Sequence, residues 1–127
     1  MGSYRELEVW RLGMALAEAS YRVTSRFPPS EQFGLVSQVR RAAVSIPANV
    51  AEGQCRQRPA AFRNHVSIAL GSHGELETCL ALALRLRLID ARAMAELEPL
   101  LNSVGRLLLG LHRSLGTTSV GPRSANR

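Results

Sequence analysis

The stretch from Gly34 to Gly53 most constrains how this chain can fold. Its apolar residues recur at steps of three and four, the spacing of one face of an α-helix, at Leu35, Val39, Ala42, Ile46 and Val50. Pro47 lies inside this pattern, where a proline removes one backbone hydrogen bond and costs about 3 kcal/mol. We therefore expect a helix from about Ser30 to Ala51 that bends near Pro47, with Gly53 as its C-terminal cap.

Similar periodicity predicts three further helices, at about residues 3–26, 59–88 and 91–116. We expect Ser3 and Glu6 to form a capping box, and Asp90 and Gly116 to begin and end the last helix. In the first helix the expected buried seam consists of Leu7, Trp10, Met14, Ala17, Tyr21 and Thr24.

Four helices joined by short loops predict an all-α fold, an antiparallel up-down-up-down four-helix bundle over residues 1–116. Residues 117–127 contain turn formers without periodicity, which predicts a disordered tail. The third and fourth helices carry apolar residues outside their seams, at Ile68, Leu70, Leu82, Leu84, Leu86, Leu100, Leu107 and Leu109. This surplus apolar surface predicts contacts between copies of the chain, and His73 on the third seam is expected in a core or an interface.

The formal net charge is +6, and all 16 basic residues are arginine. Five arginines between positions 40 and 63 face only one acidic residue, Glu52: Arg40, Arg41, Arg56, Arg58 and Arg63. A basic patch of this kind favours an anionic partner, of which nucleic acid is the commonest. For Arg40, Arg41 and Glu52 an internal or inter-subunit ion-pair set is the alternative, whereas Arg56, Arg58 and Arg63 are expected to be exposed.

Motifs of enzymatic chemistry are absent from the sequence. The two cysteines, Cys55 and Cys79, form no C-x-x-C pair, no glutamate precedes a histidine by three residues, and no phosphate-binding glycine loop occurs. We therefore expect a non-enzymatic protein without metal or cofactor. Neither a signal peptide nor a membrane-spanning run is evident, so we expect a cytoplasmic protein that does not bind membranes.

Three segments resemble the four-helix-bundle proteins encoded in intervening sequences of bacterial 23S ribosomal RNA genes. They are Y-R-E-L-E-V-W (4–10), R-F-P-P-S-E-Q-F-G-L-V-S-Q-V-R-R-A-A-V-S-I-P-A-N-V-A-E-G (26–53) and I-A-L-G-S-H-G-E-L-E-T (68–78). The resemblance implies a bundle that assembles into a homo-oligomer, typically a pentameric ring. Relatives that are accessory variability determinants of diversity-generating retroelements imply binding of nucleic acid and of a reverse transcriptase through a basic surface. Arg40, Arg41 and Glu52 match the family motif, while Gln54, Arg58 and His73 depart from it. These departures make the loop more basic and the seam of the third helix more polar.

Together these features predict an oligomeric, non-enzymatic accessory protein that binds nucleic acid, with RNA as the expected ligand. The residues expected to contact phosphates are Arg40, Arg41, Arg56, Arg58 and Arg63. The alternative is an oligomeric scaffold that docks an acidic protein partner, such as a reverse transcriptase.

Overall fold

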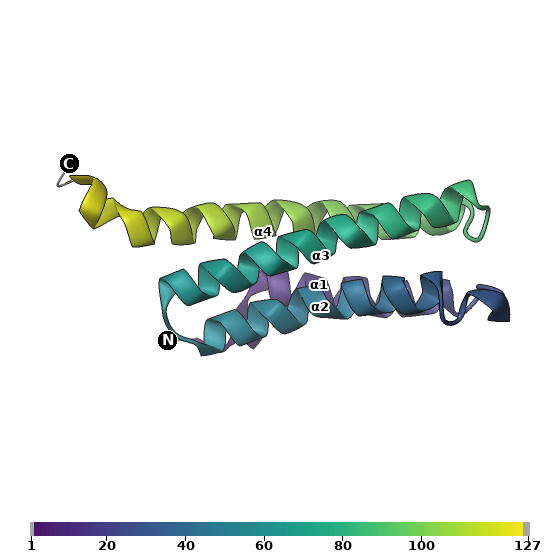
Figure 1. Cartoon of the computed structure of the whole chain (residues 1–127), viewed down its shortest axis with the longest axis horizontal. Helices are drawn as coiled ribbons and strands as arrows, with labels where there is room; N and C mark the ends of the chain where they lie inside the picture. Colours follow the sequence, from purple (N-terminus) through teal and green to yellow (C-terminus); the bar gives the residue numbers. More distant parts are fainter. Residues whose placement is uncertain (1, 126–127) are drawn as a thin grey trace.

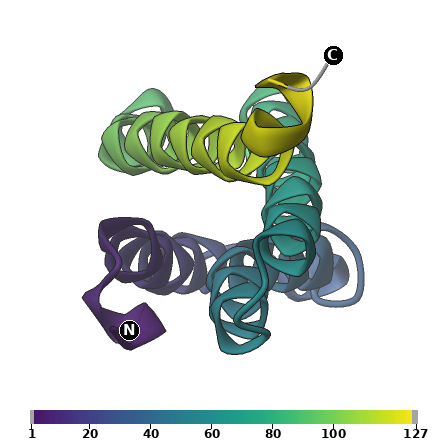
Figure 2. The same ribbon diagram turned by 90° about the vertical axis from the view of Figure 1, so that its left-hand side faces the viewer.

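The computed structural model describes residues 2–125, with side chains through Gly116. In this part the chain forms four α-helices, α1 (Glu8–Thr24), α2 (Leu35–Cys55), α3 (Pro59–Arg85) and α4 (Ala91–Ala125), and two short 3₁₀ turns, Tyr4–Glu6 and Pro29–Glu31. Consecutive helices run antiparallel, with the chain start, the α2–α3 connection and the end of α4 on the left of Figure 1. Seen end-on in Figure 2, each helix packs against two others, and α4 closes the ring on α1. The predicted all-α four-helix bundle is confirmed.

A single apolar core runs along the axis of this bundle. Its largest fully buried side chains are leucines, isoleucine and valines from all four helices: Leu16, Ile46, Leu76, Leu80, Leu97, Leu108, Val39, Val50, Val66 and Val104. Each such side chain contributes about 1.5–3 kcal/mol when it leaves water. The core therefore stabilises the bundle, and the polar residues Ser20 and Thr24 of α1 are also buried.

The first helix begins later than the sequence predicts. Leu7 is extended, with a ψ angle of 128°, so α1 starts at Glu8 and not at Ser3. Ser3 instead caps the preceding 3₁₀ turn, where its hydroxyl accepts a hydrogen bond from the Arg5 backbone N–H at 3.2 Å. The expected capping box of an α-helix at Ser3 was therefore wrong, because the chain leaves helical geometry at Leu7.

The buried stripe of α1 also differs from the expected seam. Leu16 and Val23 are buried, whereas Met14 and Tyr21 are 42% and 44% exposed. The sequence offers two overlapping apolar stripes on this helix, and contacts with both α2 and α4 select the one that contains Leu16. Met14 and Tyr21 are consequently left on the outer surface between α1 and α2.

The second helix begins at Leu35, five residues after the expected cap at Ser30. Pro29 starts a 3₁₀ turn, and Gly34 then adopts φ −107° and ψ −112°, outside the helical region. The carboxylate of Glu31 accepts a hydrogen bond from the Leu35 N–H at 3.3 Å and so replaces the predicted serine cap.

Gly53 does not end α2, which continues to Cys55. A methyl group at Gly53 would meet the Cβ of His65 and the Cδ1 of Phe62 at 2.8 Å, so this glycine permits close approach of α3. The reversal falls instead at Gln57, whose φ angle of 58° is left-handed. The predicted glycine cap was therefore wrong, since Gly53 serves packing and not chain reversal. Pro47 lies within the continuous α2, and the bend expected there stays a prediction.

The end of α3 uses the same left-handed device. The helix ends at Arg85, earlier than expected, because Arg87 adopts a φ angle of 62°. The Arg87 N–H then donates to the Leu84 carbonyl at 3.0 Å, and the Leu88 N–H donates to the Ala83 carbonyl at 2.9 Å. These are the two hydrogen bonds of a Schellman motif, formed without glycine.

The fourth helix begins where the sequence predicts but extends further. The carboxylate of Asp90 accepts a hydrogen bond from the Ala93 N–H at 2.8 Å, which confirms the predicted cap. The helix continues past Gly116 to Ala125, since the backbone at Gly116 does not turn to positive φ. The side chains of residues 117–127 lie outside the described part, and the boundary between a domain at 1–116 and a tail at 117–127 stays a prediction.

Candidate nucleic-acid interface

The five candidate arginines form two groups and not one continuous patch. Arg40 and Arg41 lie in the first half of α2, whereas Arg56, Arg58 and Arg63 surround the α2–α3 connection. Arg40 and Arg56 are 16 positions apart, which places them roughly 24 Å apart along the helix axis. A single phosphate cluster cannot therefore span all five.

Arg40 joins α2 to α1. Its Nε donates to the Thr24 hydroxyl at 2.9 Å, and its guanidinium lies over the Tyr21 ring, 4.4 Å from the ring centroid. The Thr24 hydroxyl in turn donates to the Ser20 carbonyl at 2.7 Å. These contacts favour the internal role that the sequence left open for Arg40, since a stacked and hydrogen-bonded guanidinium is already partnered.

Arg41 and Arg56 form exposed ion pairs. A nitrogen of Arg41 lies 3.7 Å from a carboxylate oxygen of Glu75 on α3, and a nitrogen of Arg56 lies 3.2 Å from a carboxylate oxygen of Glu52, one turn away. Exposed pairs of this kind contribute about 0–1 kcal/mol. Both guanidinium groups can therefore exchange their carboxylate for a phosphate at little cost.

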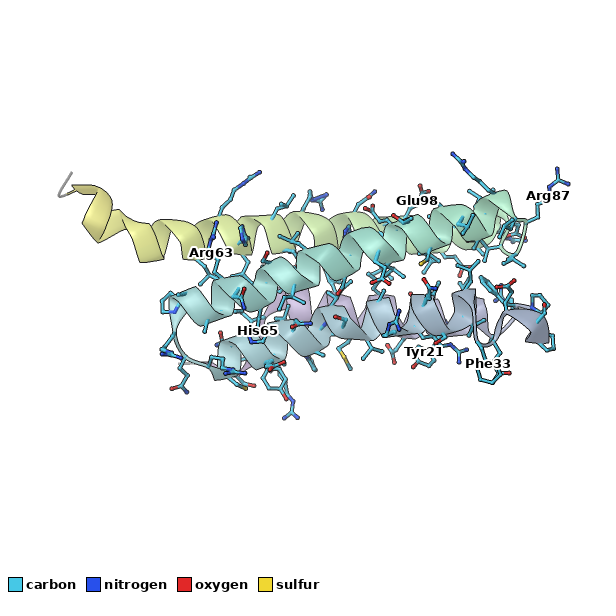
Figure 3. The ribbon with its side chains drawn as sticks, viewed as in Figure 1. Tyr21, Phe33, Arg63, His65, Arg87 and Glu98 are labelled. Atoms are coloured by element: carbon cyan, nitrogen blue, oxygen red, sulfur yellow. The ribbon has the colours of Figure 1, made fainter. Side chains whose placement is uncertain are left out.

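Arg58 and Arg63 differ in exposure although they are close in sequence. Arg58 is exposed at the N-cap of α3, where its carbonyl accepts the Phe62 N–H at 2.9 Å. Arg63 is half-buried, and its Nε donates to the His112 carbonyl of α4 at 3.3 Å. Its guanidinium covers Gly116, where a Cβ atom would lie 2.8 Å from Nε. Arg58 is thus free to reach a ligand, whereas its hydrogen bond to α4 restrains Arg63. Figure 3 shows the Arg63 side chain extending from α3 toward α4.

A series of polar contacts links α2 to α3. The hydroxyls of Ser45 and Ser72 lie 2.7 Å apart, and the Asn49 amide nitrogen donates to the Ser45 carbonyl at 2.9 Å. The Asn49 amide oxygen faces Nδ1 of His65 at 3.1 Å, and Nε2 of His65 lies 3.9 Å from the Glu52 carboxylate. The sequence analysis did not identify these contacts, because they join residues up to 27 positions apart.

The net charge of the bundle is unevenly distributed along its axis. We call the half with the α2–α3 connection the turn end (residues 2–15, 46–72 and 102–125), and the other half the far end (residues 16–45 and 73–101). Described side chains of the turn end include seven arginines and three glutamates: Arg5, Arg11, Arg56, Arg58, Arg63, Arg106, Arg113, Glu6, Glu8 and Glu52.

The far end carries seven arginines and seven acidic residues: Arg22, Arg26, Arg40, Arg41, Arg85, Arg87, Arg92, Glu18, Glu31, Glu75, Glu77, Asp90, Glu96 and Glu98. Its formal charge is therefore zero, and the excess positive charge of the described side chains belongs to the turn end. Such a local excess is what attracts a polyanion.

An apolar groove between α1 and α2 is the second surface of interest. Met14, Val44 and Pro47 line it, together with the charged residues Glu18 and Arg22. Beside it, Phe33 is 93% exposed and lines a recess with Arg40. The sequence analysis missed this groove because it placed Met14 in the core.

Two searches of the described residues bear on the chemistry that this chain supports. Across the described side chains, no group of three histidine, cysteine, aspartate or glutamate residues could hold a metal ion. Among the described helices, none combines the length and the apolar character that a membrane span requires.

Comparisons with known proteins agree with the fold. A crystal structure of a protein with unknown function from the S23 ribosomal protein family of Bacteroides thetaiotaomicron superposes with a TM-score of 0.73. It is 24% identical, and the match covers 82% of this chain and 97% of that one. No curated protein matches the sequence significantly. The family model of the 23S rRNA-intervening sequence protein matches residues 5–110, and the chain therefore belongs to the 23S rRNA-intervening sequence protein family.

Proposed function

We propose that this protein is a non-enzymatic, oligomeric RNA-binding protein that holds phosphates with the arginines of its turn end. The observation that carries this proposal is the charge distribution, because the excess arginines gather in one half of the bundle while the other half is neutral. Arginine forks suit phosphate oxygens, and no element that reads base edges is evident among the described residues. Binding is therefore expected to depend on charge and not on sequence.

Arg56 and Arg58 are the residues proposed to reach the RNA first. Both are exposed at the α2–α3 connection, and among the described side chains Arg56 forms a weak, exposed ion pair with Glu52. Arg41 contributes less because it lies in the neutral far end, and Arg40 is engaged with Thr24 and Tyr21. An RNA-binding role is consistent with the cytoplasm, where we propose that the protein acts.

The test measures RNA affinity against salt concentration. Fluorescence anisotropy with several short RNAs of unrelated sequence is expected to show an affinity that falls steeply as the salt concentration rises from about 50 to about 200 mM. The double variant Arg56→Ala/Arg58→Ala should weaken the binding of all the RNAs alike. It should also lower the slope of log affinity against log salt concentration by about two.

The matched control is Arg85→Ala/Arg87→Ala, which removes two arginines from the far end. It should change RNA affinity little, because the far end carries no excess charge. Affinity that is independent of salt, or an equal loss in both double variants, would contradict the proposal.

Oligomerisation is proposed to use the outer stripe of α3. Ile68, Leu82 and Leu86 are 45%, 45% and 54% exposed, and their spacings of 14 and 4 positions place them on one face. Glu75 lies midway between Ile68 and Leu82 and pairs with Arg41, so the stripe borders α2. Light scattering coupled to size exclusion should give an assembly, with a pentamer expected from the family resemblance. Leu82→Arg should dissociate it, whereas Ala81→Arg on the same helix should not.

A scaffold that docks an acidic protein, such as a reverse transcriptase, is the second candidate function. It is favoured by the α1–α2 groove, whose apolar lining includes Met14 and Val44 and which also contains the charged pair Arg22 and Glu18. An amphipathic segment with an acidic side chain placed beside Arg22 would complement the apolar lining and this arginine. The test is co-expression with a reverse transcriptase followed by nuclease treatment. Val44→Glu should abolish co-purification of the reverse transcriptase and leave RNA affinity intact. If this variant still retained the partner, the groove would be excluded as the docking site.

A further inference from the structure

A polar recess lies between α3 and α4 at the turn end of the bundle. It has a volume of about 330 Å³ and is lined by Ala60, Arg63, Asn64, Ser67 and His112. The four α3 residues are spaced by three, one and three positions, which places them on one face of the helix. His112 of α4 completes the lining from the other side. The recess therefore gathers four polar side chains from two helices and no carboxylate.

We propose that this recess is an oxyanion site that holds one phosphate group of the bound RNA. This inference rests on the proposed function, which it refines by assigning a built pocket to a single phosphate. The recess lies in the half of the bundle that carries the excess positive charge, so the long-range field and the local donors favour the same ligand.

Arg63 supplies the charge and is already oriented. Its Nε–H is used by the His112 carbonyl at 3.3 Å, and its guanidinium rests on Gly116, which has no side chain to displace it. The remaining N–H groups of the guanidinium are the fork that binds oxyanions. Because the side chain is held before the ligand arrives, less rotamer entropy is lost on binding.

Asn64, Ser67 and His112 supply neutral donors around this charge. The amide and the hydroxyl each carry an N–H or O–H group, and the imidazole carries at least one. In the part of the chain that the structure describes, no hydrogen bond within the chain is assigned to these three side-chain groups. They are thus available to the several oxygens of one phosphate, which a lone surface arginine could not surround.

The test pairs RNA binding with binding of inorganic phosphate. In the double variant Asn64→Ala/Ser67→Ala, both changed residues are exposed, so the fold should be retained and Arg63 should stay in place. Because two hydrogen bonds to the phosphate are lost, the affinity for RNA is expected to fall about tenfold, alike for all RNA sequences. In NMR titrations, inorganic phosphate should shift the ring signals of His112 in the wild type and not in this variant.

The matched control is Asn102→Ala/Ser103→Ala, which removes the same two residue types from α4 outside the recess. It should leave both RNA affinity and the phosphate titration unchanged. If Arg56→Ala/Arg58→Ala weakens RNA but Asn64→Ala/Ser67→Ala does not, the recess inference is overturned while the proposed function stands.

The remaining outcomes separate the possible sources of the phosphate. A wild type that binds inorganic phosphate in the recess but binds no RNA would assign the site to a small phosphate compound and would overturn its role in RNA binding. A wild type in which neither ligand moves the His112 signals would overturn the recess as an oxyanion site of any kind.

Discussion

The Nδ1 atom of His65 on α3 lies 3.1 Å from the amide oxygen of Asn49 on α2. The Asn49 amide nitrogen donates to the carbonyl and the hydroxyl of Ser45, at 2.9 and 3.0 Å, which turns the amide oxygen toward the ring. Nδ1 of His65 must therefore carry the proton, and Nε2 is left facing Glu52 at 3.9 Å. This contact joins α2 to α3 beside Glu52, which also forms the ion pair with Arg56.

Asn49→Ala should destabilise the bundle. The change removes the amide contacts and leaves Nδ1 of the half-buried His65 without its acceptor, so a loss of about 1–3 kcal/mol is expected. Urea denaturation followed by circular dichroism measures the free energy of unfolding. Asn102→Ala, at an exposed position on α4, is the control and should change stability little. Equal effects of the two substitutions would show that the Asn49–His65 contact contributes nothing.

Gly53→Ala and Gly71→Ala should have opposite signs. A Cβ at Gly53 would meet Phe62 and His65 at 2.8 Å, so α3 must move away and about 1–3 kcal/mol should be lost. No neighbouring atom lies within 4 Å of a Cβ at Gly71, inside α3, where alanine should gain about 0.5–1 kcal/mol from helix propensity. Melting temperatures of the two variants test this, and a stabilised Gly53→Ala protein would refute the close contact.

Arg87→Gly should stabilise the protein even though it removes an arginine. The left-handed φ of 62° at Arg87 costs a side-chain-bearing residue roughly 1–2 kcal/mol, a strain that glycine does not suffer. The greater backbone entropy of unfolded glycine offsets part of this gain, which leaves about 0.5–1 kcal/mol. Arg85→Gly removes the same charge from the last residue of α3 and should cost up to about 1 kcal/mol. Thermal unfolding of both variants gives the comparison, and a destabilised Arg87→Gly protein would contradict it.

The two cysteines should differ strongly in reactivity. Burial raises the pKa of the Cys79 thiol, and the nearby Glu75 carboxylate adds to the rise while Arg41 opposes it. Cys55 is exposed. At mildly alkaline pH a disulfide reagent should therefore modify Cys55 quickly and Cys79 slowly, which the single variants Cys55→Ala and Cys79→Ala can separate. Equal rates would mean that the Cys79 site opens freely to solvent.

The same shift sets the sign of a pH effect on stability. Because the pKa of Cys79 is higher in the folded protein than in the unfolded chain, the folded state holds this proton more tightly. The contribution of the Cys79 thiol to stability is complete below its pKa in the unfolded chain. It is lost as the pH rises toward its pKa in the folded protein. The stability of the wild type should thus fall more steeply than that of Cys79→Ala in alkaline solution, as denaturation at several pH values would measure.

The fold could be predicted from the sequence because its signal is local. Apolar steps of three and four between Leu35 and Val50 define a helix without knowledge of its neighbours, and Asp90 marks a helix start by its side-chain chemistry. The helix ends were less predictable, since Gln57 and Arg87 adopt left-handed backbone angles that their residue types do not favour. Gly53 was misassigned because its role depends on contacts with α3.

For the candidate site, the sequence predicted an excess of arginines over acidic residues but not the contacts that each arginine makes. The sequence gives no sign that Arg40 stacks on Tyr21, or that Arg63 donates to a carbonyl 49 positions away. Met14 and Leu16 belong to two apolar stripes on one helix, and only the order of helices around the bundle decides which stripe is buried. Pairings across helices therefore separate the arginines that are engaged from those that remain available.

The unequal halves of the bundle also act before any contact forms. A rod with net positive charge at one end and no net charge at the other has an electric moment along its axis, so the field of a polyanion exerts a torque on it. The molecule should turn its α2–α3 connection toward the RNA during approach, which shortens the search for a productive orientation. Added salt would then slow association itself, and not only weaken the complex once it has formed.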